Sequence, residues 1–181
     1  MQYRPAVLAL ALAAAPAFVL SPVSAALAQA QDAGTQQLLA AQGWTALAYS
    51  EKDGKVCYLV GSPTKSEPAN LSRGRIDLYV THRPGEKAFN VVHFDAGYPY
   101  KQGSSADLDI DGRKFTLFTD KDAAWTPDSA SDKTVTEALA KGKRAILKGT
   151  SARGTETTDT YTLAGFDKAL AAIDKACDVR R

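Results

Sequence analysis

The sequence predicts an antiparallel β-sandwich with one or two helices. Short β-type runs separated by Gly-containing turns fill most of the chain from Trp44 onward. The predicted strands outnumber the predicted helices and do not alternate with them, which argues against a βαβ protein. The sequence also lacks an internal repeat of roughly 20 to 50 residues, which argues against a solenoid.

The first thirty residues predict a secretory signal peptide. Arg4 precedes an apolar run, and two small-x-small sites follow at residues 26–28 and 28–30. We expect cleavage near Ala28 or Ala30, because the apolar run is short for a membrane span and the chain then turns polar. The mature protein would then work in the periplasm or outside the cell, with no integral membrane segment. A retained signal anchor is the alternative.

After cleavage, roughly 150 residues remain, which suits one domain. We expect that domain over residues 43–181, preceded by a Gln- and Ala-rich linker or short helix over residues 31–42.

The charges of the chain are nearly balanced, with 22 Lys plus Arg against 20 Asp plus Glu and both signs interspersed. The best basic cluster, residues 141–148, is interrupted and modest, so we do not expect nucleic-acid binding.

Two hairpins are predicted in the first half of the domain. Residues 44–50 and 55–61 flank Asp53-Gly54, a sequence typical of a tight hairpin turn, and counting back from it places Tyr49 opposite Tyr58. Residues 75–82 and 88–94 flank a loop with Pro and Gly in turn positions.

Two further hairpins are predicted in the second half. Residues 107–110 and 113–119 flank Asp111-Gly112, and residues 143–151 and 155–163 flank Arg153-Gly154. The expected cross-strand pairs are Leu108 with Phe115, Asp109 with Lys114, Lys148 with Asp159, Ile146 with Tyr161, and Thr150 with Thr157.

Two helices complete the predicted fold. Residues 132–141 carry apolar side chains at helical spacing, with Asp132 as N-cap and Gly142 as the stop, and form a short crossover helix. Residues 166–177 place five apolar side chains along one stripe that ends at Cys177. This C-terminal helix is expected to pack against the sheets.

The only cysteines, Cys57 and Cys177, are expected to form a disulfide. An even pair in an exported protein is more often a bond than two free thiols. Free buried thiols are the alternative. With two cysteines and no C-x-x-C motif, a redox enzyme is not expected.

Two motifs suggest metal binding but do not predict it. Asp107, Asp109 and Asp111 copy the opening of a calcium loop, but Phe118 stands where the loop needs a bidentate acid. The two histidines, His82 and His93, fall near opposite ends of their hairpin, about 15 Å apart at about 3.3 Å per residue. No metal site and no cofactor are therefore predicted.

The sequence predicts no catalytic residue. It has no Gly-x-Ser-x-Gly elbow, dinucleotide fingerprint or P-loop. Glu156 and Asp159 could serve a glycosidase, but on a strand they project to opposite faces.

A binding surface is easier to assign than a catalytic site. Residues 97–103 hold Tyr98 and Tyr100 on a frame stiffened by Pro and flanked by Gly. Trp125 and Arg153 lie in or near other loops and are the further candidates for this surface. The alternative is that the rings cover the ends of the core.

Several short strings together resemble the invasion associated locus B family of small exported alphaproteobacterial proteins. They are Gly43-Trp44, Cys57, residues 81–84, 97–99, 109–112 and 115–119, Ala124-Trp125, residues 148–155, Gly165-Phe166 and Ala176-Cys177. The resemblance implies an immunoglobulin-like sandwich in the periplasm or at the cell surface, and for founding members a part in host-cell invasion. It implies no known reaction.

The leading hypothesis is a non-enzymatic exported protein that binds an envelope or host component through loop residues. A second is an envelope chaperone-like or stress protein that uses a free strand edge. A third is a polysaccharide or peptidoglycan hydrolase.

Overall fold

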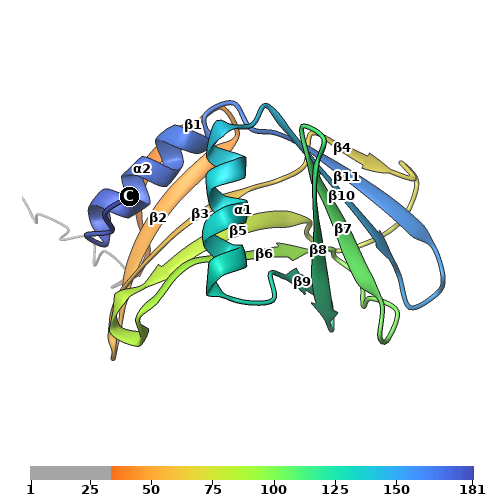
Figure 1. Ribbon diagram of the computed structural model, residues 1–181, viewed down its shortest axis with the longest axis horizontal. Coiled ribbons are helices and arrows are strands. Elements are labelled where there is room, and N and C mark those ends of the chain that lie inside the picture. The colour runs from red at the N-terminus through yellow and green to blue at the C-terminus, as the bar shows by residue number, and fades with distance from the viewer. Residues whose placement is uncertain (1–33) are drawn as a thin grey trace, which may run out of the picture. The chain divides into compact units, whose positions relative to one another are not determined.

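The structure, a computed structural model, describes residues 34–181, so the predicted signal peptide lies outside the described residues. Figure 1 shows the order of the elements. They are β1 (Gln36–Ala41), β2 (Trp44–Glu51), β3 (Gly54–Gly61), β4 (Lys65–Glu67), β5 (Asp77–Arg83), the 3-10 turn η1 (Pro84–Glu86), β6 (Ala88–Asp95), β7 (Ser105–Ile110), β8 (Arg113–Asp120), β9 (Ala123–Trp125), α1 (Ser129–Lys141), β10 (Arg144–Thr150), β11 (Glu156–Thr162) and α2 (Phe166–Ala176).

The strands form one antiparallel sheet in the order β1-β2-β3-β5-β6-β9-β8-β7-β10-β11-β4. The short strand β9 pairs with both β6 and β8 and so joins the two halves of the sheet. The prediction of a mainly antiparallel β fold with a crossover helix and a C-terminal helix is confirmed. Hydrogen bonds make one continuous sheet out of what was expected to be two, and the immunoglobulin-like detail stays a prediction.

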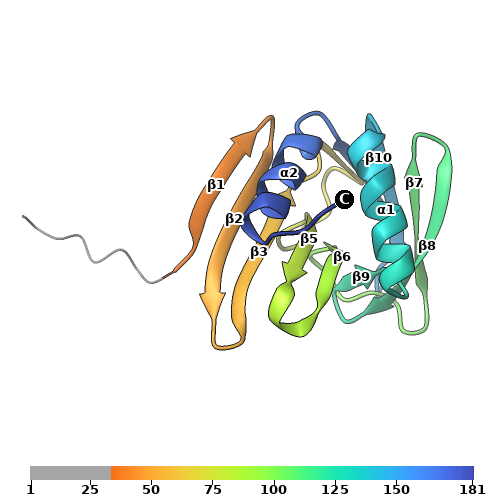
Figure 2. The ribbon, with the colours of Figure 1, turned by 60° about the vertical axis from the view of Figure 1, so that its left-hand side comes forward.

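The core lies on the face of the sheet that the helices cover. Trp44 of β2 contacts Phe166 of α2 edge-on, with ring centroids 4.9 Å apart. Phe94 of β6 meets Tyr161 of β11 at 5.7 Å, so the two halves of the sheet also pack against each other. Helix α2 packs on β1, β2 and β3 while α1 packs on β6, an arrangement that Figure 2 shows from the side. We call this the inner face and the opposite one the outer face.

The predicted strand register is confirmed in the β7–β8 hairpin and wrong in the β2–β3 hairpin. In β7–β8 the expected pairs of Leu108 with Phe115 and Asp109 with Lys114 are confirmed. In β2–β3 the prediction is wrong, because Glu51 pairs with Gly54 and the turn residues are 52 and 53. Tyr49 therefore lies opposite Val56 instead of Tyr58.

The predicted β10–β11 register is wrong by one residue. Lys148 lies opposite Thr158, Ile146 opposite Thr160 and Thr150 opposite Glu156. A shift of one residue moves every side chain to the other face of a sheet. Its main consequence is that Asp159 lies opposite Leu147 on the inner face, where it is 1 % exposed.

Two further predictions need correction. Residues 36–41 form strand β1, paired with β2, where a linker or short helix was expected.

Helix α1 begins at Ser129 with Asp128 as its N-cap, and the Asp128 side chain accepts a hydrogen bond from the Ser131 N–H. Asp132 is instead buried and accepts hydrogen bonds from the Val92 N–H and the Thr126 hydroxyl, which ties α1 to β6. The predicted stop at Gly142 is confirmed.

The predicted disulfide is present between Cys57 and Cys177, whose Cα atoms are 6.1 Å apart. Cys57 lies on the inner face of β3 and Cys177 directly follows α2. Both are buried, at 0 % and 6 % exposure. The bond therefore fixes the end of the C-terminal helix to the sheet across 120 residues of sequence.

Candidate binding surface

Of the residues predicted to form a binding surface, the structure brings the loop of Tyr98 and Tyr100 next to the turn of Arg153, where the Ala152 N–H donates to the Pro99 carbonyl at 2.8 Å. Tyr100 is only 6 % exposed, and its ring lies against Gly149, where a Cβ atom would collide with it. Tyr100 packs in the core and exposes little surface, and its contact with a partner stays a prediction. Trp125 lies on the outer face of the sheet, whereas Arg153 is exposed in the turn between β10 and β11.

Tyr98 belongs to a buried polar cluster. Its hydroxyl lies 2.5 Å from Thr157 Oγ1, and its ring centroid lies 5.6 Å from the Arg73 guanidinium. Burial raises the pKa of Tyr98. Arg73 in turn pairs with Asp159, and both side chains are at most 4 % exposed. These contacts give Tyr98 a structural role.

A band of aromatic side chains crosses the outer face on six strands. We call these residues the aromatic band: Tyr49, Tyr58, Tyr79, His93, Trp125 and Phe118, from β2, β3, β5, β6, β9 and β8 in spatial order. Tyr79 pairs directly with His93, His93 with Trp125, and Trp125 with Phe118. Aromatic cross-strand neighbours of this kind stabilise a sheet through side-chain contact.

The rings of the aromatic band contact one another along the row from Tyr49 to Trp125. Tyr79 and His93 stack at 4.6 Å between centroids and 4° between planes, and His93 and Trp125 stack at 4.4 Å and 18°. Tyr49 and Tyr58 meet edge-on at 6.0 Å. Because stacked rings cover each other's faces, the row presents ring edges and hydroxyl groups to the outside. This surface suits contact with a protein better than a platform on which sugar rings lie flat.

The aromatic band is uncharged and is not covered by either helix. Burial raises the pKa of Tyr79 to about 12 and lowers the pKa of His93 to about 4, so both are neutral at neutral pH. Phe118 is 50 % exposed, and the other members of the band are partly exposed. An outer sheet face normally carries polar residues. An aromatic row in that position makes the outer face a candidate interaction surface.

The buried imidazole of His93 predicts acid sensitivity. Its pKa is about 4 in the folded protein and 6.5 ordinarily, so below pH 6.5 the unfolded chain binds a proton that the folded protein does not. Its contribution to stability is complete above pH 6.5 and falls towards pH 4. The free energy of unfolding, measured with urea, should drop by about 3 kcal/mol more in the natural protein than in His93→Phe over this range. Parallel pH profiles for the two proteins would contradict this prediction.

Charged residues lie at both sides of the aromatic band. At one side Arg83 pairs with Glu51 at 2.6 Å, and the Tyr49 hydroxyl donates to Glu51 at 2.9 Å. At the other side Asp77 is 1 % exposed and accepts from Arg75 Nε at 2.6 Å. An apolar centre with a polar rim is the usual composition of a protein interface.

The buried His82–Asp174 pair is structural. His82 Nδ1 accepts a hydrogen bond from the Asn90 N–H at 3.0 Å, so Nε2 carries the proton and donates it to Asp174 at 2.9 Å. Burial alone would raise the pKa of Asp174, but hydrogen bonds from His82 and Arg181 outweigh burial and lower it. Neither ring nitrogen is free to take a proton from a nucleophile. The pair links β5 to α2.

The motifs considered for metal binding have other roles. His82 lies on the inner face and His93 on the outer face, so the two cannot bind one ion. Asp109 accepts from the Gly112 N–H, and Asp111 accepts from the Lys143 N–H at 2.6 Å. Two of the three carboxylates of the calcium-like motif, those of Asp109 and Asp111, are thus engaged by backbone groups.

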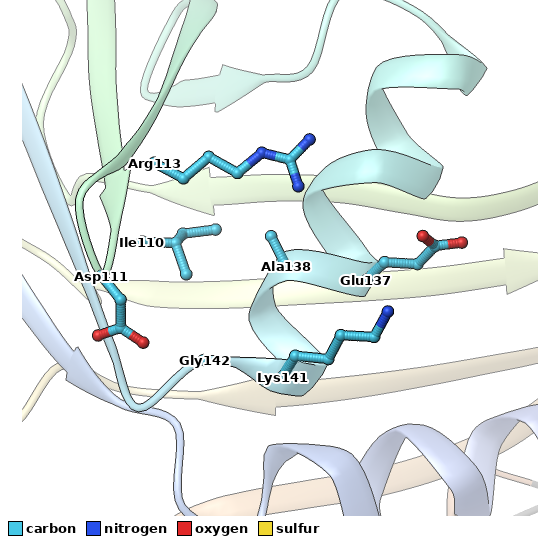
Figure 3. A pocket seen from close by; sticks show the side chains of 7 residues that line it. All are labelled: Ile110, Asp111, Arg113, Glu137, Ala138, Lys141 and Gly142. Atoms are coloured by element: carbon cyan, nitrogen blue, oxygen red, sulfur yellow. The ribbon is translucent and has the colours of Figure 1, made fainter.

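A hollow between α1 and the β7–β8 turn brings opposite charges near each other. Its volume is about 250 Å³, and its lining includes Asp111, Arg113, Glu137 and Lys141. Figure 3 shows the Asp111 carboxylate turned away from Glu137. The two acids do not converge on one point, so this hollow offers no acid–base pair.

A second hollow holds two carboxyl groups. It has a volume of about 510 Å³, and its lining includes Asp95, Asp122, Arg75, Lys121 and Tyr98. Burial raises the pKa of Asp95, and the neighbouring Asp122 and Asp77 raise it further. An acid with a raised pKa beside a second carboxylate is an arrangement that could do proton-transfer chemistry.

Comparison with known proteins identifies the family. Residues 44–174 match the model of the invasion associated locus B (IalB) protein family. The chain belongs to the IalB family. The matched range begins with β2, ends within α2 and contains the whole aromatic band, whereas β1 lies outside it. No curated protein and no solved structure matches this IalB protein.

Within residues 34–181, neither helix of this IalB protein has the length and apolar character needed to cross a membrane.

The aromatic band was missed by the sequence analysis, although a signal for it exists. Tyr79 lies between the buried Leu78 and Val80, and His93 between the buried Val92 and Phe94. Aromatic residues thus occupy alternating positions where polar residues are expected.

Proposed function

We propose that this IalB-family protein is exported and non-enzymatic, and that it binds an envelope or host-surface component through the aromatic band. The observation that carries the proposal is the uncovered aromatic row on the outer face. It replaces the surface around Tyr98 and Tyr100 that the sequence analysis favoured.

The composition of the outer face supports a protein as partner. Tyr, Trp and Arg are the residues that contribute most to binding energy in protein interfaces. The band provides Tyr49, Tyr58, Tyr79 and Trp125, and Arg83 lies at its rim. The stacked rings are already held in place, so binding would order few side chains.

Export is supported by the predicted signal peptide and by the disulfide. A buried structural disulfide between Cys57 and Cys177 fits an oxidising compartment. The proposal therefore places the protein in the periplasm or at the cell surface. It assigns no cofactor and no nucleic acid as a partner.

Phe118→Ser should weaken binding of an envelope or host-surface protein by at least tenfold. Phe118 is the most exposed ring of the band, so its removal deletes contact area while leaving the core intact. The measurement is affinity capture from envelope or host-membrane extract with quantitative mass spectrometry.

Lys114→Ser is the matched control, because Lys114 is exposed on the same strand, β8, four residues from Phe118. Retention of the partner by Lys114→Ser and its loss from Phe118→Ser support the proposal. Equal retention by both variants would remove the aromatic band from the binding surface.

A second candidate function is an envelope chaperone-like or stress protein. Strand β1 at the end of the sheet has six residues without charge, and it could pair with an extended segment of an unfolded chain. This function predicts that the protein suppresses aggregation of an unfolded outer-membrane protein diluted from urea. It also predicts that Ala40→Lys, on the free strand, abolishes the suppression.

A third candidate is a hydrolase of polysaccharide or peptidoglycan, favoured by Asp95 and Asp122 in one hollow. The carboxyl with the raised pKa would protonate the leaving oxygen while the second carboxylate assists the water or the sugar. Release of reducing ends from peptidoglycan by the natural protein, but not by Asp95→Asn, would establish this activity. Absence of release leaves binding as the function.

A further inference from the structure

Within residues 34–181, the sheet has one strand edge that is open to pairing. Strand β1 is the first strand in the sheet order and pairs only with β2 among the described residues. Its sequence, QQLLAA, contains no charged residue and no proline. After a bulge at Leu38, residues 39–41 pair regularly with β2, and alternate backbone N–H and C=O groups point away from it. Such an edge is a template for another strand.

The opposite edge of the sheet is protected. Strand β4 has three residues, and Lys65 and Glu67 form an ion pair at 2.9 Å along it. Pro68, which has no backbone N–H, follows directly. Short length, charge and proline are the common means of preventing edge pairing. The two edges therefore differ in length, charge and proline content, and β1, with its regular residues 39–41 after the bulge, is the one better suited to pairing.

With the predicted cleavage, the mature chain would keep too few residues before β1 to cover its edge. Cleavage near Ala28 or Ala30 would leave residues 29–33 or 31–33, at most five, before Gly34. A hairpin needs a turn of two residues or more and a strand after it, so these residues are too few. Beyond α2, Arg181 bonds to Asp174 and Asn90, away from β1.

We propose that a second copy of this chain covers the edge, with β1 pairing antiparallel to β1 of the partner across a two-fold axis. In such a pair each strand faces itself, so a charged residue would often meet its own charge. Strand β1 carries none. Leu38 and Leu39, both partly exposed, gain cover from the partner strand. The resulting sheet is continuous through both protomers.

The symmetry of this dimer has a consequence for binding. A two-fold axis perpendicular to the sheet keeps the outer faces of both protomers on the same side. The dimer therefore displays two aromatic bands side by side, which makes binding to a surface with repeated sites bivalent. This consequence rests on the proposed function, whereas the dimer itself does not.

Sedimentation equilibrium of the signal-free protein tests the dimer, with Ala40→Lys as the disrupting variant. Ala40 is exposed and lies opposite Thr45 on the outer face, so the lysine leaves the monomer intact and places two like charges close together in the dimer. Thr116→Lys makes the same charge change on β8, away from both edges. We expect a concentration-dependent dimer in the natural protein and in Thr116→Lys. In Ala40→Lys we expect self-association to be at least tenfold weaker, so that this variant is a monomer at the same concentrations.

Hydrogen exchange supplies a readout that does not depend on a variant. Amides of residues 36–41 should exchange more slowly as protein concentration rises. A monomer up to hundreds of micromolar, or a dimer that Ala40→Lys leaves unchanged, would overturn the proposal. A dimer lost in Phe118→Ser but kept in Ala40→Lys would place the contact at the aromatic band and also overturn it. Binding of Phe118→Ser to extract proteins, measured separately, tests the proposed function on its own.

Discussion

Replacing Cys57 and Cys177 by alanine is expected to lower the free energy of unfolding by about 4 to 5 kcal/mol in the chain-entropy relation. The bond closes a loop across 120 residues, so it removes a large number of conformations from the unfolded chain. It also fixes α2 to β3, and α2 covers the inner faces of β1 and β2. Urea unfolding of the oxidised protein and the double variant measures the difference.

Reductant provides the control for this prediction. It should destabilise the natural protein by a similar amount and leave the double alanine variant unchanged. A difference in unfolding free energy under about 1 kcal/mol between the oxidised and the reduced protein would contradict the assigned role of the bond.

Arg73→Met is expected to destabilise the protein by about 3 to 5 kcal/mol, because it leaves Asp159 charged and unpaired in the core. The Arg73 Nη1 donates to Asp159 Oδ2 at 3.0 Å, and the second guanidinium nitrogen pairs with Oδ1. The two side chains are 4 % and 2 % exposed. Tyr98, whose ring lies near the guanidinium, should become more accessible in this variant.

The double variant Arg73→Met/Asp159→Leu distinguishes a lost ion pair from lost packing. It should recover a large part of the stability, since an apolar pair replaces a lone buried charge. Lys65→Met breaks an exposed pair with Glu67 and should change stability by less than about 1 kcal/mol. If Arg73→Met and Lys65→Met had equal effects, the buried pair would have no special role.

The two Asp-Gly turns predicted the register correctly in one hairpin and wrongly in the other. Asp111-Gly112 forms a two-residue turn, so the pair of Leu108 with Phe115 followed directly. At Asp53-Gly54 the glycine belongs to the strand, and the register differs by two residues from the prediction. No local pattern distinguished these turns, because both carry the same Asp-Gly sequence.

The position of Asp159 depended on a residue far away in the sequence. The predicted β10–β11 register assumed a two-residue turn at Arg153-Gly154, which put Asp159 opposite Lys148 on the solvated face. The Ser151 N–H instead donates to the Thr155 carbonyl, so the turn has three residues, 152–154. The side chain lies inside because Arg73, 86 residues earlier, pairs with it there. A single sequence does not reveal such a pair.

The aromatic band could be recognised only in part for the same reason. Its members come from six strands, and the order of those strands in the sheet brings them together. The alternation of Tyr79 and His93 with buried neighbours was visible in the sequence. That they form one row with Trp125 depended on β9 pairing with both β6 and β8.

A hydrogen-exchange footprint of the captured partner on this protein tests the central claim most directly. We predict protection on binding in the peptides of β5, β6 and β9, which carry Tyr79, His93 and Trp125. Protection confined to residues 97–103 and the turn at Arg153 would contradict the claim and return the binding surface to the loops.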